Sequence, residues 1–282
     1  MTPIRFLFSL ILLFILNNCH SQSFTGQSWS GVKKQGRGTL DVIYYEQPGL
    51  IEKTGGGQFR GANVELINQF VSFVEKKYGT KLTPNFYNEE DGNKFYEIIA
   101  SNLYTLGVGN ISMTSERMLK YKFTPPVIPN IMILMSHSDS PTISKIDELR
   151  NSFKDHTSVA IAGSTSIPLL ERIKSKYLPS LSIIVVPSST VLLETIQNTP
   201  KSFSIADFTE LISAQRNKMK LKRHPVMLER AEDTGFMMSK KSDWDTVWNE
   251  FLTSEFKNSN AYKKIISENL GSTFLNSLQA LR

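Results

Sequence analysis

The sequence predicts an α/β protein built from two sheets that face each other across a cleft. Short apolar, β-branched runs alternate along the chain with amphipathic segments of about 10–15 residues, a pattern typical of mainly parallel sheets covered by helices on both faces. The loops at the carboxyl ends of such strands are where α/β proteins bind ligands. With 282 residues, 40% hydrophobic and 21% charged, the chain is long enough for one large or two medium globular domains.

Residues 1–21 are predicted to be a secretory signal peptide. Arg5 precedes the apolar run Phe6–Leu16, and the small residues Cys19 and Ser21 provide a cleavage site before Gln22. A membrane-spanning helix needs about 20 apolar residues, so this run is too short to be one. We therefore expect export to the periplasm. Cys19 is the single cysteine, and it is either removed with the signal peptide or retained as a lipid anchor.

Residues 22–38 are rich in Gln, Ser and Gly and are predicted to form a flexible leader. The elements that follow are recognised by their apolar periods and by turn residues. In chain order they are a strand at Leu40–Tyr45, a glycine-rich hairpin at Thr54–Gln58, a helix from Asn63 that ends at Gly79, a strand at Leu82–Tyr87 and a helix at Asn93–Ser101.

The stretch from Leu106 to Pro126 has the parts of a carboxylate-binding site. A short strand ends at Gly109, Thr114 or Ser115 can cap a short helix, and this helix carries Arg117. An arginine beside hydroxyls and free amides can bind both oxygens of a carboxylate. The alternative is an ordinary strand, turn and helix with a solvated arginine.

The second half of the chain repeats the alternation. Gly163–Ser166 follows a buried strand and opens a helix, which offers a second helix N-terminus lined by amides and hydroxyls. The predicted strands are Ile131–Met135, Ser158–Ala162, Leu181–Val186 and Phe203–Ala206, and the predicted helices are Ile143–Phe153, Ile167–Tyr177, Thr190–Gln197, Asp207–Gln215, Asp245–Phe256, Ala261–Leu270 and Phe274–Leu281. The segments Val226–Leu228 and Gly235–Ser239 are expected to return the chain to the first of the two halves.

The pattern S-x-T-x-x-R at Ser112–Arg117, followed by Phe-Thr-x-Pro at residues 123–126, resembles the signature of the bacterial extracellular solute-binding proteins of family 3. These are two-lobed amino-acid binders with the type II "Venus flytrap" fold, hinge strands and a ligand cleft. The resemblance covers residues 39–275 in order. It implies a discontinuous first lobe at residues 39–130 and 229–282 and a second lobe at 131–228. Ala62, Asn63 and Thr105 depart from the family pattern.

The resemblance also implies the roles of single residues in the first lobe. Arg117 would hold the ligand α-carboxylate with Ser112 as its hydroxyl partner, and Asn110 would offer its backbone carbonyl to the ligand ammonium. Tyr44 or Tyr45, at the end of the first strand, would form an apolar wall of the cleft. For these tyrosines a place in the sheet core is the alternative.

In the second lobe, the turn Gly163, Ser164 and Thr165 matches the family turn that donates to the same carboxylate. Asp207 matches the aspartate that pairs with the α-ammonium. A cap on the helix that follows is the alternative role for Asp207.

These expectations define a monomeric binding protein that captures a small carboxylate-bearing, amino-acid-like ligand by hinge closure, for a transporter or a sensor. No cofactor is expected, and the four histidines lack metal-ligand spacing.

Two alternatives to this function stay open. One is a cleft enzyme that dehydrates prephenate-like acids with Asp207 or Glu46 as the acid; the other is a repurposed module that binds peptidoglycan fragments or a protein. The net charge of the chain is +6, and its basic residues cluster at residues 216–223. This cluster fits a solvated helix end and not a nucleic-acid surface.

Overall fold

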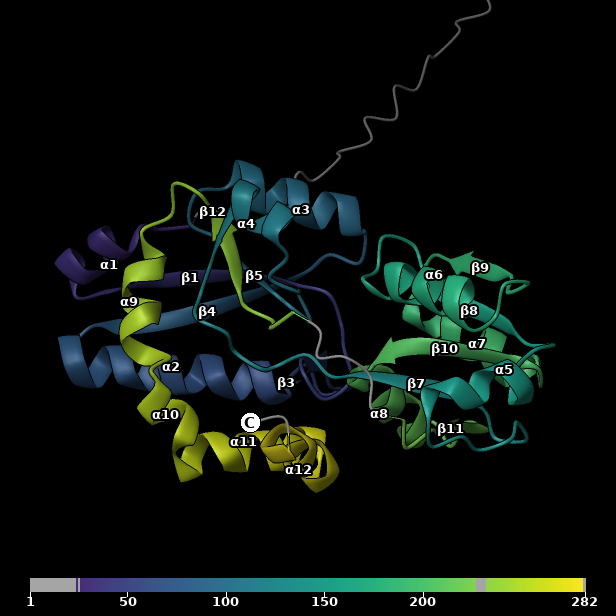
Figure 1. Ribbon diagram of the computed structural model, residues 1–282. Helices are drawn as coiled ribbons and strands as arrows, with labels where there is room; N and C mark the ends of the chain where they lie inside the picture. Colours follow the sequence, from purple (N-terminus) through teal and green to yellow (C-terminus); the bar gives the residue numbers. More distant parts are fainter. Residues whose placement is uncertain (1–23, 25, 227–231, 281–282) are drawn as a thin grey trace, which may run out of the picture.

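The computed structural model describes residues 24, 26–226 and 232–280, and in it the strands form two five-stranded sheets and one hairpin. The two sheets belong to two lobes that lie side by side (Figure 1). The predicted signal peptide and Cys19 lie outside the described residues. Within them, no helix has the length and apolar character needed to cross a membrane.

The sheet of the first lobe has the strand order β4-β1-β5-β12-β6, and that of the second lobe has the order β11-β7-β10-β8-β9. The first sheet contains β1 (Arg37–Tyr44), β4 (Lys81–Asn88), β5 (Leu106–Val108), β6 (Tyr121–Phe123) and β12 (Met237–Ser239). The second contains β7 (Met132–His137), β8 (Thr157–Ile161), β9 (Ile183–Val186), β10 (Ser202–Asp207) and β11 (Leu221–Arg223). The glycine-rich hairpin pairs β2 (Glu52–Lys53) with β3 (Phe59–Arg60), as predicted.

Both sheets are mixed, so the expectation of mainly parallel sheets is wrong. β1 pairs in parallel with β4 and β5, but β12 is antiparallel to both β5 and β6. In the second lobe β8 is parallel to β9 and β10, whereas β7 is antiparallel to β10 and β11. The antiparallel pairs involve the strands at the two connections between the lobes, where the chain enters a sheet without a crossover helix.

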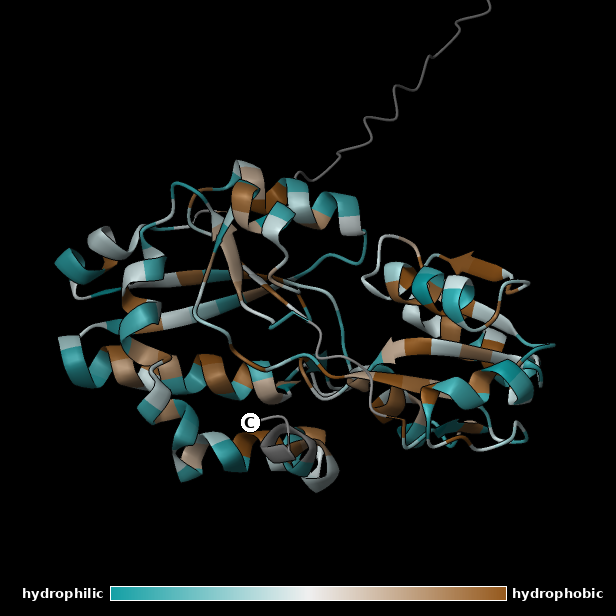
Figure 2. Cartoon of the chain, viewed as in Figure 1, coloured by the Kyte–Doolittle hydropathy of each residue, from teal (hydrophilic) through white to brown (hydrophobic). Residues whose placement is uncertain are grey.

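Helices cover both faces of each sheet, and in Figure 1 α2 and α3 lie on opposite faces of the first one. Figure 2 shows the apolar residues gathered on the strands and on the helix faces that meet them. The first lobe contains α1 (Trp29–Gln35), α2 (Ala62–Tyr78), α3 (Gly92–Ser101), α4 (Ser115–Lys120), α9 (Trp244–Phe251), α10 (Ser254–Asn258), α11 (Asn260–Leu270) and α12 (Ser272–Ala280). The second contains the 3-10 turn η1 (Ile146–Glu148), α5 (Leu149–Ser152), α6 (Ser166–Lys176), α7 (Ser189–Asn198) and α8 (Phe208–Arg216).

The core of the first lobe joins the beginning of the chain to its end. Phe70 of α2 stacks on Trp248 of α9, with ring centroids 3.7 Å apart, and also meets Phe251. The C-terminal segment therefore completes a core that the N-terminal segment begins.

The chain passes between the lobes after β6 and again after β11. The predicted boundaries at residues 130–131 and 228–229 fall within these two connections, the second outside the described residues.

The predicted flexible leader is wrong for residues 29–38, which form α1 and the start of β1. Trp29 is 6% exposed and packs its ring against Tyr78 and Trp244. The Asp243 carboxylate accepts hydrogen bonds from the backbone N–H groups of Trp29 (2.8 Å) and Ser30 (2.9 Å), which α1 itself cannot satisfy. The leader is thus tied to the C-terminal part of the lobe.

Two predicted helices differ from those observed. The helix expected at Ile143–Phe153 is only η1 and α5, because the backbone N–H of Ile143 donates to His224 Nδ1 (3.2 Å) and not into a helix. The helix expected at Asp245–Phe256 is divided into α9 and α10. Thr253 causes the division, since its hydroxyl caps α10 by accepting from the Phe256 N–H (3.2 Å).

Candidate functional site

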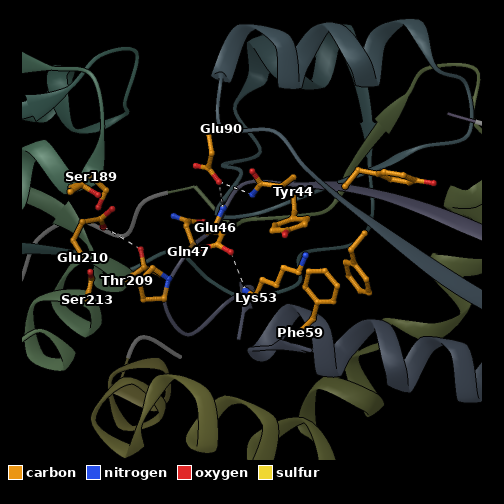
Figure 3. Close-up of a pocket in the computed structure, with 15 residues that line it drawn as sticks. Tyr44, Glu46, Gln47, Lys53, Phe59, Glu90, Ser189, Thr209, Glu210 and Ser213 are labelled. Carbon is orange, nitrogen blue, oxygen red and sulfur yellow. Dashed lines mark hydrogen bonds between the residues drawn. The ribbon is translucent and has the colours of Figure 1, made fainter. Parts of the chain in front are cut away.

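Two adjoining compartments lie between the lobes. The first, here called the Arg117 compartment, has a volume of about 450 Å³, and the second, the Tyr44 compartment, has about 790 Å³. They share a boundary formed by Glu46, Gln47, Glu90, Ser189, Thr190 and Glu210. Both lobes contribute to both compartments. Figure 3 shows Ser189 and Glu210 of the second lobe facing Glu46, Gln47 and Lys53 of the first across the Tyr44 compartment.

The Arg117 compartment contains all eight residues that the sequence singles out. They are Tyr45, Asn110, Ser112, Arg117, Gly163, Ser164, Thr165 and Asp207. Residues more than 160 positions apart in the chain are thus brought to one cavity, although their contacts with a ligand stay a prediction.

Arg117 is held in place by α4 and by its neighbours. The Thr114 hydroxyl caps this helix by accepting the Arg117 N–H (3.2 Å), as predicted for Thr114 or Ser115. Arg117 Nη1 donates to the backbone carbonyl of Ser112 (3.0 Å), and the guanidinium lies 5.4 Å from the ring centroid of Tyr96. Ser112 thus contacts the arginine through its carbonyl, and the guanidinium keeps other N–H groups for a carboxylate.

Asp207 ends β10 and occupies the N-cap position of α8, but its side chain makes no capping hydrogen bond. Instead it accepts hydrogen bonds from the side chains of Asn130 and Asn110. Its Oδ1 is closed off from solvent and has no hydrogen-bond partner among the described residues. Burial raises the pKa of Asp207, while the two asparagines and Arg117 lower it. Asp207 therefore lines the cavity and does not cap α8.

The turn before α6 supplies the opposite wall. Gly163 has a φ of 70°, a left-handed conformation that favours glycine. The Ser164 and Ser166 hydroxyls lie 2.7 Å apart, and the Thr165 side chain makes no capping bond to α6. Exposed hydroxyls and amides of this turn can donate to an anion in the compartment.

Tyr44 and Tyr45 point to different sides of β1, as neighbours at the end of a strand do. Tyr45 lines the Arg117 compartment and meets Phe95 edge to face at 5.2 Å. Burial raises the pKa of Tyr45, so its hydroxyl stays neutral. Tyr44 lines the other compartment, where its ring meets Phe59 and Phe86. Tyr45 thus forms part of the wall of the Arg117 compartment, and Tyr44 forms part of the wall of the Tyr44 compartment.

Glu210 is a residue of this cleft that the sequence reasoning missed. It is 4% exposed, lies about one helical turn after Asp207 on α8, and lines both compartments. Its Oε2 accepts from the Thr209 hydroxyl (3.2 Å), and Ser189 also hydrogen-bonds to it. Burial, followed by the nearby charge of Asp207, raises the pKa of Glu210 to about 8. The i,i+3 spacing from Asp207 was the available signal.

Two other residues that shape the cleft, Gln47 and Tyr96, had no signal in the sequence. Gln47 Oε1 accepts the backbone N–H of Asn110 (2.6 Å) and so fixes the residue after β5. Tyr96 supplies the ring beneath Arg117, and burial raises the pKa of its hydroxyl. The direction in which these two side chains point is set by the folded chain and cannot be read from the local sequence.

The fold and the cleft together define the class: this is the two-lobed, type II periplasmic-binding-protein fold. No protein-family model matches the sequence. No curated protein matches it either. The fold is shown by solved structures that resemble the chain at low sequence identity, and three of them are described next.

The first solved structure comes from a study of glutathione import via GshT and the cystine importer TcyBC of Streptococcus mutans. It has a TM-score of 0.66 at 18% identity, and the match covers 83% of this chain and 95% of the other. The second, substrate-binding domain 2 of GlnP from Lactococcus lactis, has a TM-score of 0.61 at 18% identity over 83% and 96% of the two chains. The third is an ancestral amino-acid-binding protein that is a precursor of cyclohexadienyl dehydratase, with a TM-score of 0.63 at 18% identity over 86% and 98%.

Proposed function

We propose that the protein is an extracytoplasmic solute-binding protein that captures an amino-acid-like ligand between its lobes. One observation carries this proposal: Arg117 from the first lobe and Asp207 from the second line the same cavity, each with hydrogen-bonding capacity left unused. A guanidinium and a carboxylate on opposite walls match the carboxylate and the ammonium of an α-amino acid. The solved structures named above, which include a substrate-binding domain and an amino-acid-binding protein, support the same reading.

The proposed binding mode uses both walls. The ligand carboxylate accepts from Arg117, from the amides of Gly163 and Thr165 and from the hydroxyls of Ser164 and Thr165, and the ammonium donates to the carboxylate of Asp207. Because these groups sit on different lobes, a ligand that touches all of them stabilises the closed arrangement over an open one. Binding, and not bond-making, is then the function, and no catalytic residue or cofactor is needed.

The setting of this function is part of the proposal. The predicted signal peptide supports export to the periplasm, with Cys19 either removed or lipidated. The mature protein is proposed to be a monomer that delivers its ligand to a membrane transporter or sensor. The importer-associated structures that share the fold support a transporter as the partner.

A thermal-shift screen of residues 22–282 against the L-amino acids, small dicarboxylates and peptidoglycan peptides tests the proposal. A ligand at about 100 times its Kd stabilises the folded protein by roughly 2.7 kcal/mol, which is a clear shift in Tm. We expect an amino acid to give this shift, and Arg117→Ala and Asp207→Ala to abolish it. A shift that survives Arg117→Ala, or one produced only by peptidoglycan peptides, would contradict the proposal.

A dehydratase acting on prephenate-like acids is the second candidate, and one observation favours it. Such an enzyme needs an acid that keeps its proton near neutral pH, and Glu210 is a buried carboxyl of that kind in the cleft. An absorbance assay that follows the loss of prephenate tests this activity. Turnover that Glu210→Gln abolishes would establish a dehydratase, and no turnover would exclude dehydratase activity on prephenate.

A further inference from the structure

Glu210 is an additional acid in the cleft that capture of a simple amino acid does not use. Asp207 already accounts for one ligand ammonium, and Arg117 for one carboxylate. This second carboxyl is 4% exposed and lines both compartments, and its hydrogen bonds from Thr209 and Ser189 come only from the second lobe. An acid buried at the boundary of two compartments is placed to meet a cationic group of a ligand. It lies on the second-lobe side of the boundary where the two compartments meet (Figure 3).

The Tyr44 compartment next to Glu210 suits an elongated cationic group. One wall is aromatic: Phe59 stacks on Phe86 at 4.5 Å, and Tyr44 meets both rings. The rim facing Glu210 is acidic, with Glu46 and Glu90 placed together because the Glu46 N–H donates to Glu90 Oε1 (3.0 Å). Aromatic faces and carboxylates both attract amines and guanidinium groups.

Few cations of the protein itself compensate these acids. Lys53 is the basic side chain among the described residues that line the Tyr44 compartment, and it is exposed. In the neighbouring compartment, Arg117 faces Asp207. The acids of the cleft thus exceed its bases, and a ligand with excess positive charge restores the balance.

We propose that Glu210 binds a second cationic group of the ligand, an amine or a guanidinium at the end of an aliphatic chain that runs from the Arg117 compartment toward the Tyr44 compartment. This inference rests on the proposed function, because it takes the α-carboxylate and α-ammonium to be held by Arg117 and Asp207. The ligand class is then the cationic α-amino acids. The size of the Tyr44 compartment, about 790 Å³, leaves space for the side chain.

The protonation of Glu210 gives the binding a pH dependence. The groups that face it are Asp207 at the start of its own helix, Glu46, Lys53 and Glu90 of the first lobe, and Tyr45 and Arg117 of the neighbouring compartment. In the empty cleft a carboxyl with a pKa of about 8 keeps its proton at pH 7. A bound cation favours the ionised form and so releases that proton. Affinity for a cationic ligand therefore rises between pH 6 and pH 8, by up to about tenfold per pH unit.

The test compares L-arginine with L-citrulline, which has the same shape but a neutral side-chain end, by titration calorimetry on residues 22–282. A hydrogen bond to a charged group contributes about 1.5–3 kcal/mol, so we expect L-arginine to bind about 10–100-fold more tightly. Glu210→Gln should bring the two ligands to similar affinity and remove the pH dependence. Glu171→Gln, which changes an exposed carboxylate on α6, should leave both unaltered.

A second measurement uses the unmutated protein and so does not depend on how Glu210→Gln folds. Titrations in two buffers of different ionisation enthalpy should show close to one proton released with L-arginine at pH 7 and none with L-citrulline. Equal affinities for the two ligands, or no proton release, would overturn the role of Glu210 and leave the proposed function standing. If no amino acid binds at all, the proposed function fails and this inference fails with it.

Discussion

Gly109 allows Tyr45 to line the cleft. A Cβ at residue 109 would lie 2.6 Å from Cε1 and Cζ of Tyr45 and 2.8 Å from its hydroxyl, distances that no methyl group tolerates. The two residues stand at the ends of neighbouring strands, β1 and β5. The ring of Tyr45 can therefore reach the Arg117 compartment only because the residue opposite has no side chain.

Gly109→Ala should weaken ligand binding as well as stability. We expect a loss of about 1–3 kcal/mol in the free energy of unfolding from overpacking, and a roughly tenfold rise in Kd because Tyr45 is displaced. Urea unfolding and calorimetry measure the two effects. Gly38→Ala is the matched control: its Cβ would meet Gln27 Oε1 and Val32 Cγ2 at 2.5 Å, away from the cleft. A Kd that changes equally in both variants would contradict the prediction.

The residues that the sequence singles out by a local signal line the cleft, and their roles toward a ligand stay predictions. Other residues that line the cleft were missed. Arg117 and Asp207 stand at helix starts after strands, so the sequence shows which edge of the sheet they reach. Glu210 and Tyr96 lie within amphipathic helices, where an acidic or aromatic residue is usually part of the solvated or the apolar face. Whether such a residue turns toward a cleft depends on the partner lobe, which local sequence does not describe.

Helix α8 connects the cleft to the other lobe. It carries Asp207 and Glu210 near its start, while Arg216 at its end forms an ion pair with Glu52 of the β2–β3 hairpin. Phe208 also meets Phe274 of α12, with ring centroids 4.8 Å apart. The helix that begins at these two second-lobe carboxyls is thus in contact with the first lobe, and the proposed ligand binding would act on a helix that also touches the other lobe.

Helix α1 is expected to contribute substantially to stability. Trp29→Ala removes a buried ring from its contacts with Tyr78 and Trp244 and should cost about 3–5 kcal/mol in urea unfolding. Gln35→Ala is the control, since its side chain is exposed at the end of α1 and should change the result by no more than about 0.5 kcal/mol. If Trp29→Ala costs no more than the control, α1 is an accessory and not part of the core.

The errors in the predicted elements share a cause. Helix α1 has seven residues and buries only Trp29 and Val32, too few apolar positions to establish a period, and its composition is that of a linker. The strands β6, β11 and β12 have three residues each, too short to show alternation. Their antiparallel pairing is set by residues more than 80 positions away, so a local reading favoured the parallel arrangement of the longer βαβ units.

For the whole molecule, the division of the site between lobes predicts a change of shape. The radius of gyration measured by small-angle X-ray scattering should fall when an amino acid found in the thermal-shift screen is added, because the ligand favours closure. Asp207→Ala should not compact under the same conditions. A ligand that binds without any change in scattering would show that the lobes are already fixed in one arrangement.

The position of β12 has a consequence for the biosynthesis of the protein. This strand lies between β5 and β6, yet it is made more than a hundred residues after them, once the entire second sheet has been synthesised. Until then the first sheet lacks an inner strand, and the backbone edges of β5 and β6 have no partner in it. The first lobe therefore cannot be completed on the ribosome before residue 239 has emerged. For a chain exported as the predicted signal peptide implies, this delay keeps the first lobe incomplete until residue 239 has been made.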